Sequence, residues 1–140
     1  MKGKILNARI EGKTTYVTKQ TKYGTFTGKV TLNPEDEDVY SELDGYTFAE
    51  IKCDIQALKA RAKCMKQRAI GVEHALNVLL KAKHPITDDT MLALARQVDV
   101  AWQNYYDAYE IYAINRDSYN IRVQRSLDYR RKLKNKTKAH

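Results

Sequence analysis

A run of small and apolar residues keeps an uninterrupted heptad spacing between Phe48 and Leu79. Steps of three and four residues alternate along it, so these side chains share one stripe of a helix. The members are Phe48, Ile51, Ile55, Leu58, Ala62, Met65, Ala69, Val72, Leu76 and Leu79. Such a helix is roughly 50 Å long, too long for a core built from 140 residues to enclose. We therefore expect the stripe to pack against another long helix, from this chain or from a second copy.

The first part of the chain has the alternation of β-strands. Turn residues at Gly12-Lys13 and at Lys22–Gly24 separate the runs Lys4–Glu11, Thr14–Lys19 and Thr25–Leu32. The second run is rich in β-branched and aromatic residues, and the third places Phe26, Gly28, Val30 and Leu32 on one face. The pattern predicts a three-stranded antiparallel meander with one apolar face, which needs a cover.

Two long helices follow. Thr47 and Glu50 fit a capping box at the start of the first, and His84-Pro85 ends it. Thr87 or Asp88 then caps a second helix that contains neither Gly nor Pro as far as Lys132. We predict a single α+β domain over 1–140: a β-meander (1–32), an acidic loop (33–45), a first helix (46–84), a second, antiparallel helix (87–133) and a basic tail (134–140). Because a helical hairpin presents only two stripes, we expect a coiled-coil-like dimer or higher oligomer.

Composition limits the function classes. The formal net charge is +8, and no apolar run approaches the ~20 residues of a membrane span. Met1–Ile10 lacks the apolar core of a signal peptide, and Cys53 and Cys64 lie too far apart on one helix to bridge, so a cytoplasmic location is expected. We expect no metal site, no cofactor and no enzymatic activity, because no metal-ligand spacing, phosphate loop or catalytic motif is present.

The second helix changes character along its length. Six of the ten tyrosines lie between residues 105 and 129, and beyond Tyr112 the seam positions carry polar groups. Tyrosine rings stack on planar bases, arginines grip phosphates, and asparagine reads polar edges. The candidate ligand-binding residues are Tyr105, Tyr109, Tyr112, Asn115, Arg116, Tyr119 and Arg122, with Arg61 and Arg68 added from the first helix. For any single tyrosine, filling the core is the simpler interpretation.

The organisation resembles that of the first-described type of Thoeris anti-defence protein of phages. The residues that carry the resemblance are Gly28-Lys29-Val30-Thr31, Pro34-Glu35-Asp36 and the segment from Gly45 to Ala49. The resemblance implies a sponge in the host cytoplasm that binds a cyclic ADP-ribose-type immune signal without degrading it. It further implies homo-oligomers with ligand pockets between protomers. Some proteins of that family also bind cyclic oligonucleotide signals.

Two other functions remain open from the sequence. The basic N-terminal part and the basic tail suit a nucleic-acid-binding protein, although cations at a helix C-terminus also simply favour the helix dipole. A purely structural adaptor is the other alternative, in which replacing Arg116 and Arg122 would change oligomerisation alone.

Overall fold

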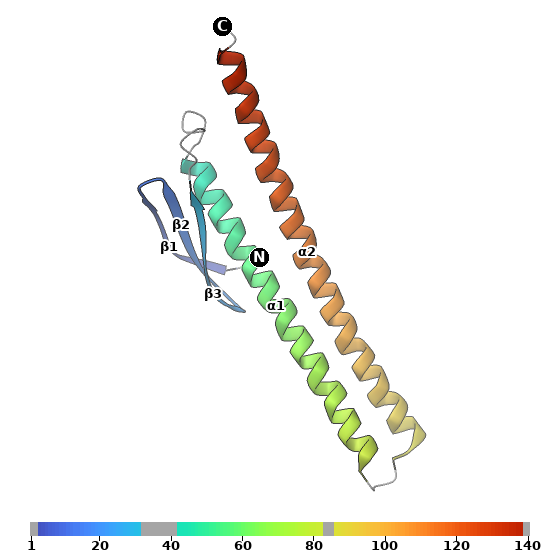
Figure 1. The fold of residues 1–140 in the computed structure, drawn as a ribbon. Helices are drawn as coiled ribbons and strands as arrows, with labels where there is room; N and C mark the ends of the chain where they lie inside the picture. Colours follow the sequence, from blue (N-terminus) through green and yellow to red (C-terminus); the bar gives the residue numbers. More distant parts are fainter. Residues whose placement is uncertain (1–2, 32–41, 83–85, 139–140) are drawn as a thin grey trace. The chain divides into compact units, whose positions relative to one another are not determined.

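The computed structural model describes residues 3–31, 42–82 and 86–138. Its elements are β1 (Gly3–Glu11), β2 (Thr14–Thr21), β3 (Gly24–Thr31), α1 (Glu42–Lys81) and α2 (Asp88–Lys138) (Figure 1). The predicted α+β class, an antiparallel sheet followed by two long antiparallel helices, is confirmed. The chain divides into two compact units: Met1–Ala57 with Ala113–His140 (unit 1), and Leu58–Tyr112 (unit 2).

The sheet in unit 1 has the strand order β1-β2-β3. Both predicted turns are present, and each uses a glycine at positive φ, with φ 61° at Gly12 and φ 135° at Gly24. At the second turn the Thr21 hydroxyl accepts a 3.2 Å hydrogen bond from the Tyr23 amide and donates to the Gly24 carbonyl. The meander is therefore closed by local interactions that the turn residues themselves supply.

One face of the sheet packs on the first part of α1. On β2 the burial alternates, with Thr15, Val17 and Lys19 buried and their neighbours partly exposed. Val17 forms a small core with Ala49 and Cys53 of α1, which Phe26, Val30 and Tyr46 surround. α1 thus supplies the cover that the meander needs.

Each helix passes its predicted bound at one end, and α1 ends at Lys81, before the predicted residue 84. α1 begins at Glu42, so Gly45 lies inside the helix instead of closing a loop, and Thr47 is not the N-cap. Acidic residues in the first turn favour this earlier start through the helix dipole. α2 continues through Lys138, where the lysines of the predicted tail are good helix formers and their charges suit a helix C-terminus. Leu32, residues 33–41 of the predicted acidic loop and His84-Pro85 lie outside the described residues.

The start of α2 agrees with the prediction. The Thr87 hydroxyl accepts a 3.2 Å hydrogen bond from the amide of Thr90, the standard contact of an N-cap residue with the third helical position. Asp88 and Asp89 occupy the first turn, where negative charge is favourable.

The heptad stripe is the less exposed face of α1. All its members except Leu79 are buried or partly buried. In unit 2 the buried positions are small and lie one heptad apart on both helices: Ala62 and Ala69 on α1, Ala101 and Ala108 on α2. Small residues let two helix backbones approach closely, so longer side chains are displaced to the flanks of this contact.

Candidate functional site

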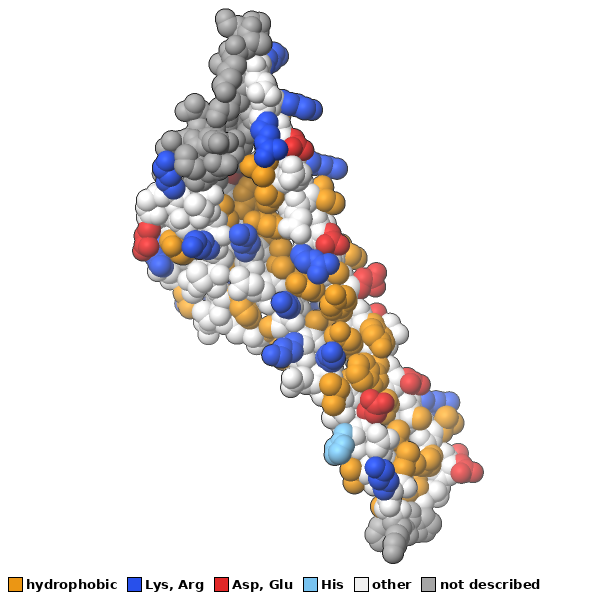
Figure 2. All heavy atoms as spheres, in the orientation of Figure 1, with side chains coloured by type: hydrophobic (Ala, Val, Ile, Leu, Met, Phe, Trp, Pro, Cys, Tyr) orange, Lys and Arg blue, Asp and Glu red, His pale blue; other side chains and the backbone are white. Residues whose placement is uncertain are grey.

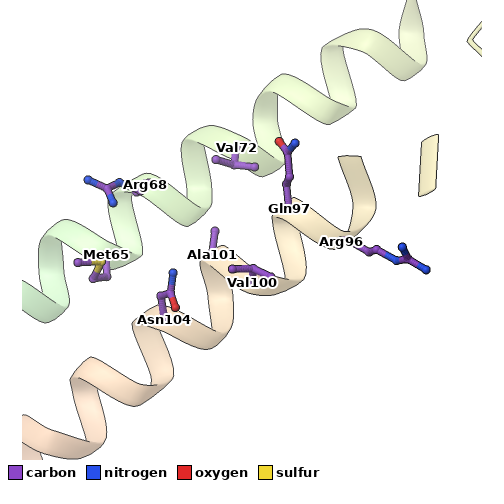
Figure 3. A pocket seen from close by; sticks show the side chains of 8 residues that line it. All are labelled: Met65, Arg68, Val72, Arg96, Gln97, Val100, Ala101 and Asn104. Atoms are coloured by element: carbon purple, nitrogen blue, oxygen red, sulfur yellow. The ribbon is translucent and has the colours of Figure 1, made fainter. Parts of the chain in front are cut away.

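A groove in unit 2 follows one flank of the contact between the two helices. Its volume is about 330 Å³, at the lower end for small-molecule sites. The lining residues are Met65, Arg68 and Val72 from α1, and Arg96, Gln97, Val100, Ala101 and Asn104 from α2 (Figure 3). Of the nine binding residues predicted from the sequence, only Arg68 is among these lining residues.

The chemistry of the groove is mixed. Met65, Val72, Val100 and Ala101 provide apolar surface, while two amides and two guanidinium groups provide polar contacts. Figure 3 shows Gln97 and Asn104 pointing from α2 toward α1, whereas the Arg96 side chain extends away from the other lining residues. Arg68 and Arg96 make no hydrogen bond or ion pair with another described residue. Arg68 is thus a solvent-exposed cation that pairs with no described acid and lies beside an apolar wall.

The heptad positions of the two amides are a sequence signal for this groove. Gln97 and Asn104 lie one heptad apart beside the α2 seam, as Arg61 and Arg68 do beside the α1 seam. In an antiparallel pair, flanking positions of this kind face each other across the contact. Arg68 and the two amides line the same groove as a result, whereas Arg61 is not among its described lining residues.

A row of aromatic side chains occupies another flank of α2 in unit 2. Trp102, Tyr105, Tyr106, Tyr109 and Tyr112 follow one another with ring centroids 5.3 to 6.2 Å apart. The Lys66 ammonium lies 5.8 Å from the centre of the Tyr105 ring, and the Trp102 indole donates a 3.3 Å hydrogen bond to Glu73. Three predicted residues, Tyr105, Tyr109 and Tyr112, therefore form a continuous aromatic surface, but none of them lines the groove.

The remaining predicted residues lie in unit 1. The Tyr119 ring meets the Phe48 ring edge-on, with centroids 6.0 Å apart, and the Arg122 guanidinium lies 5.3 Å from the centre of the Phe48 ring. These contacts join α1 to α2, which is a packing role. Arg122 also lines a second hollow of about 440 Å³ with Ser118, Ile121 and Arg125. Its two guanidinium groups suit an anion, and its apolar lining comes from Ile121.

The predicted seam beyond Tyr112 is partly confirmed. Arg116 and Tyr119 are partly buried, whereas Asn115 and Arg122 are exposed. Arg116 donates a 3.1 Å hydrogen bond from Nε to its neighbour Asp117, an ion pair whose side chains are 42% and 61% exposed. After Tyr112 the next less exposed residue on this side of α2 is Arg116, four residues on, and not Asn115, three residues on. The less exposed face therefore turns slightly around the helix at this point, which leaves Asn115 exposed.

The helices carry several exposed apolar side chains. Hydrophobic side chains gather along the visible helix surface in Figure 2, and the exposed ones in unit 2 include Ile70, Val78, Leu92, Val100 and Tyr106. Within residues 3–31, 42–82 and 86–138, no helix combines the length and apolar character of a membrane span. The same residues contain no cluster of His, Cys, Asp and Glu that could hold a metal ion.

Comparison of the chain with models of protein families, with curated proteins and with solved structures finds no match.

Proposed function

We propose that this chain binds and sequesters a nucleotide of the cyclic ADP-ribose type without degrading it, as a phage anti-defence protein in the host cytoplasm. The observation that carries the proposal is the exposed Arg68 guanidinium, which pairs with no described acid, at a groove of about 330 Å³ with apolar and amide walls. Apolar side chains cover the face of a base, amides pair with its polar edge, and a guanidinium holds phosphate through charged hydrogen bonds.

The lining of the groove suits retention of a ligand without chemistry. It contains neither a carboxylate nor a thiol, hydroxyl or imidazole that could act as nucleophile or general base. Tight binding with no reaction needs shape and charge complementarity alone. This is the property of a sponge, and the resemblance to the anti-defence family points the same way.

Calorimetry with purified cyclic ADP-ribose, followed by heat release and mass spectrometry, tests the proposal. We expect stoichiometric binding and recovery of intact ligand. Arg68→Gln should weaken binding about tenfold or more, because a hydrogen bond to a charged group contributes about 1.5–3 kcal/mol. Lys63→Gln, on an exposed part of the same helix, is the matched control and should bind normally. Recovery of a converted product, or full affinity in Arg68→Gln, contradicts the proposal.

A second candidate is nucleic-acid binding. Arg125, Arg131, Lys132 and Lys136 are exposed along the last turns of α2, where they could neutralise backbone phosphates. This function predicts a steep fall of affinity for a DNA or RNA oligonucleotide with rising salt, and its loss on deletion of residues 130–138. Binding that survives the deletion argues against it.

We also propose that the chain acts as a homo-oligomer. Several large apolar side chains of the helices in unit 2 are exposed, including Val78, Leu92 and Val100, and a contact with a second copy would bury them. Light scattering tests this directly, and a monomer at high protein concentration would exclude it.

A further inference from the structure

The strand β1 has an open edge. It pairs with β2 on one side only, and within the described residues no strand pairs with its other side. All nine of its residues are exposed, including Ile5 at 47%, Leu6 at 51% and Ile10 at 37%. Apolar side chains on an open edge strand are unusual, because such edges invite pairing with another chain.

The apolar side chains of β1 continue the covered face of the sheet. Ile5, Ala8 and Ile10 pair with Lys19, Val17 and Thr15, which are 4%, 2% and 2% exposed. Directly opposed residues of an antiparallel pair lie on the same face. The contacts of α1 go to β2 and β3, through Cys53 to the Val17 and Phe26 carbonyls and through Gln56 to that of Thr27. The helix therefore leaves the β1 part of this face open.

The strand also contains a bulge. Ile5 pairs with Lys19 and Asn7 with Thr18, so Leu6 is an extra residue relative to β2. The bulge changes which residues share a face: Ile5, Ala8 and Ile10 lie on the covered face, and Lys4, Asn7, Arg9 and Glu11 on the opposite one. Any strand added to the open edge must match this arrangement.

We propose that the occupant of this edge is β1 of a second copy, paired antiparallel about a two-fold axis at Ala8. Ala8 then faces Ala8 of the second copy, and Asn7 faces Arg9. Leu6 is the extra residue here as it is against β2, so Ile5 faces Ile10 and Lys4 faces Glu11 of the second copy. Every pair has both side chains on one face, and the two bulges are symmetric.

The chemistry of these pairs is complementary. Ile5 with Ile10 extends the apolar face, and Ala8 allows close approach on the axis. Lys4 is placed opposite the Glu11 carboxylate, which Arg9 of its own strand already contacts at 2.7 Å. By symmetry the Ile5–Ile10 pair and the Lys4–Glu11 pair each occur twice, and the Ala8 pair occurs once. If the two-fold axis instead lies at Arg9, nearer the Glu11 end of β1, Arg9 faces Arg9 of the second copy. Ile5 and Lys4 then have no partner in the other strand. The edge charges thus favour one self-pairing and oppose a shifted one.

The cross-link at the axis is the direct test. In a Cys64→Ser background, Ala8→Cys places two thiols opposite each other, at the Cα separation of about 4.5–5.5 Å that a disulfide accepts. Asn7→Cys is the matched control, since its two copies would lie about 8 Å apart. We expect Ala8→Cys to form a covalent dimer under mild oxidation at least tenfold faster than Asn7→Cys. Equal rates, or no dimer from Ala8→Cys, overturn the proposal.

A charge swap tests the register. Lys4→Glu and Glu11→Lys should each slow cross-linking of Ala8→Cys roughly three- to thirtyfold, because each places like charges opposite each other twice in the dimer. The double variant Lys4→Glu/Glu11→Lys should restore the rate. Both residues are exposed, so the fold should survive, which circular dichroism checks. A double variant as slow as the single ones contradicts the register. Neither test depends on the proposed ligand.

Discussion

Gly28 of β3 lies directly against the backbone carbonyl of Ala49 in α1, so strand and helix meet with no side chain between them. A Cβ on Gly28 would overlap that carbonyl oxygen and would also come within 3.2 Å of the Cys53 sulfur. Both belong to the small core around Val17. The packing of the helix on the sheet thus depends on the absence of one methyl group.

We expect Gly28→Ala to lower the free energy of unfolding by about 2–3 kcal/mol, because the helix must move off the strand to admit the methyl group. Urea denaturation followed by circular dichroism measures this. Gly71→Ala is the control, since Gly71 lies in α1 with nothing within 4 Å of its added Cβ. It should raise stability by about 0.5–1 kcal/mol, as alanine is the better helix former. Equal stabilities of the two variants would show that the contact is not tight.

Lys19 is the buried cation of unit 1. Its side chain is 5% exposed, and its Nζ donates to Asp54 at 2.8 Å and to Glu50 at 3.1 Å. Removing one member of such a group leaves charges without a partner, so Lys19→Met should cost about 2–3 kcal/mol. The carboxylates are partly exposed, which keeps the loss below that of a fully buried pair. Lys59→Met, on the exposed side of α1, should change stability by about 0.5 kcal/mol or less. Denaturation of both variants decides the matter.

The same lysine gives a pH dependence with a definite sign. Burial lowers the pKa of Lys19, but its hydrogen bonds to Asp54 and Glu50 outweigh burial and raise the pKa above its ordinary value of 10.5. A raised lysine pKa contributes stability below pH 10.5 that is lost as the pH rises through the folded-state value. The stability difference between the wild type and Lys19→Met should therefore stay constant from about pH 7 to 9 and shrink above pH 10.5. A difference that grows at high pH would contradict this.

The fold was largely predictable because its signals are periodic. Alternation over β2 and the glycines at Gly12 and Gly24 define the meander, and the heptad from Phe48 defines the buried face of α1. The start of α1 is not predictable from the sequence in the same way, because glycine is typical of loops, whereas Gly45 occupies a buried position inside the helix. The bulge at Leu6 has no sequence signal that we can identify.

The candidate site was less predictable, since residue type alone does not say which flank of a helix a side chain occupies. Tyrosines and arginines on α2 suggested one pocket. Instead, Tyr105 and Tyr109 contact each other on one flank, Tyr119 and Arg122 pack around Phe48, and only Arg68 reaches the groove. The amides of Gln97 and Asn104 would have been found by comparing heptad positions across the two helices.

The two cysteines should differ sharply in reactivity. Cys53 is fully buried and its thiol donates to the Val17 carbonyl at 3.1 Å, whereas Cys64 is exposed. Burial raises the pKa of the Cys53 thiol and removes it from reagents, and only the thiolate attacks them. Iodoacetamide should therefore label Cys64 at least about a hundredfold faster than Cys53, as read by peptide mass spectrometry.

Cys64→Ser should abolish the fast labelling, and urea should make Cys53 reactive. Because Gly28→Ala forces the helix away from β3 beside the Cys53 sulfur, that variant should label Cys53 faster than the wild type even without denaturant. Gly71→Ala should leave the rate unchanged. Rapid labelling of Cys53 in the native wild type would mean that α1 does not stay closed on the sheet.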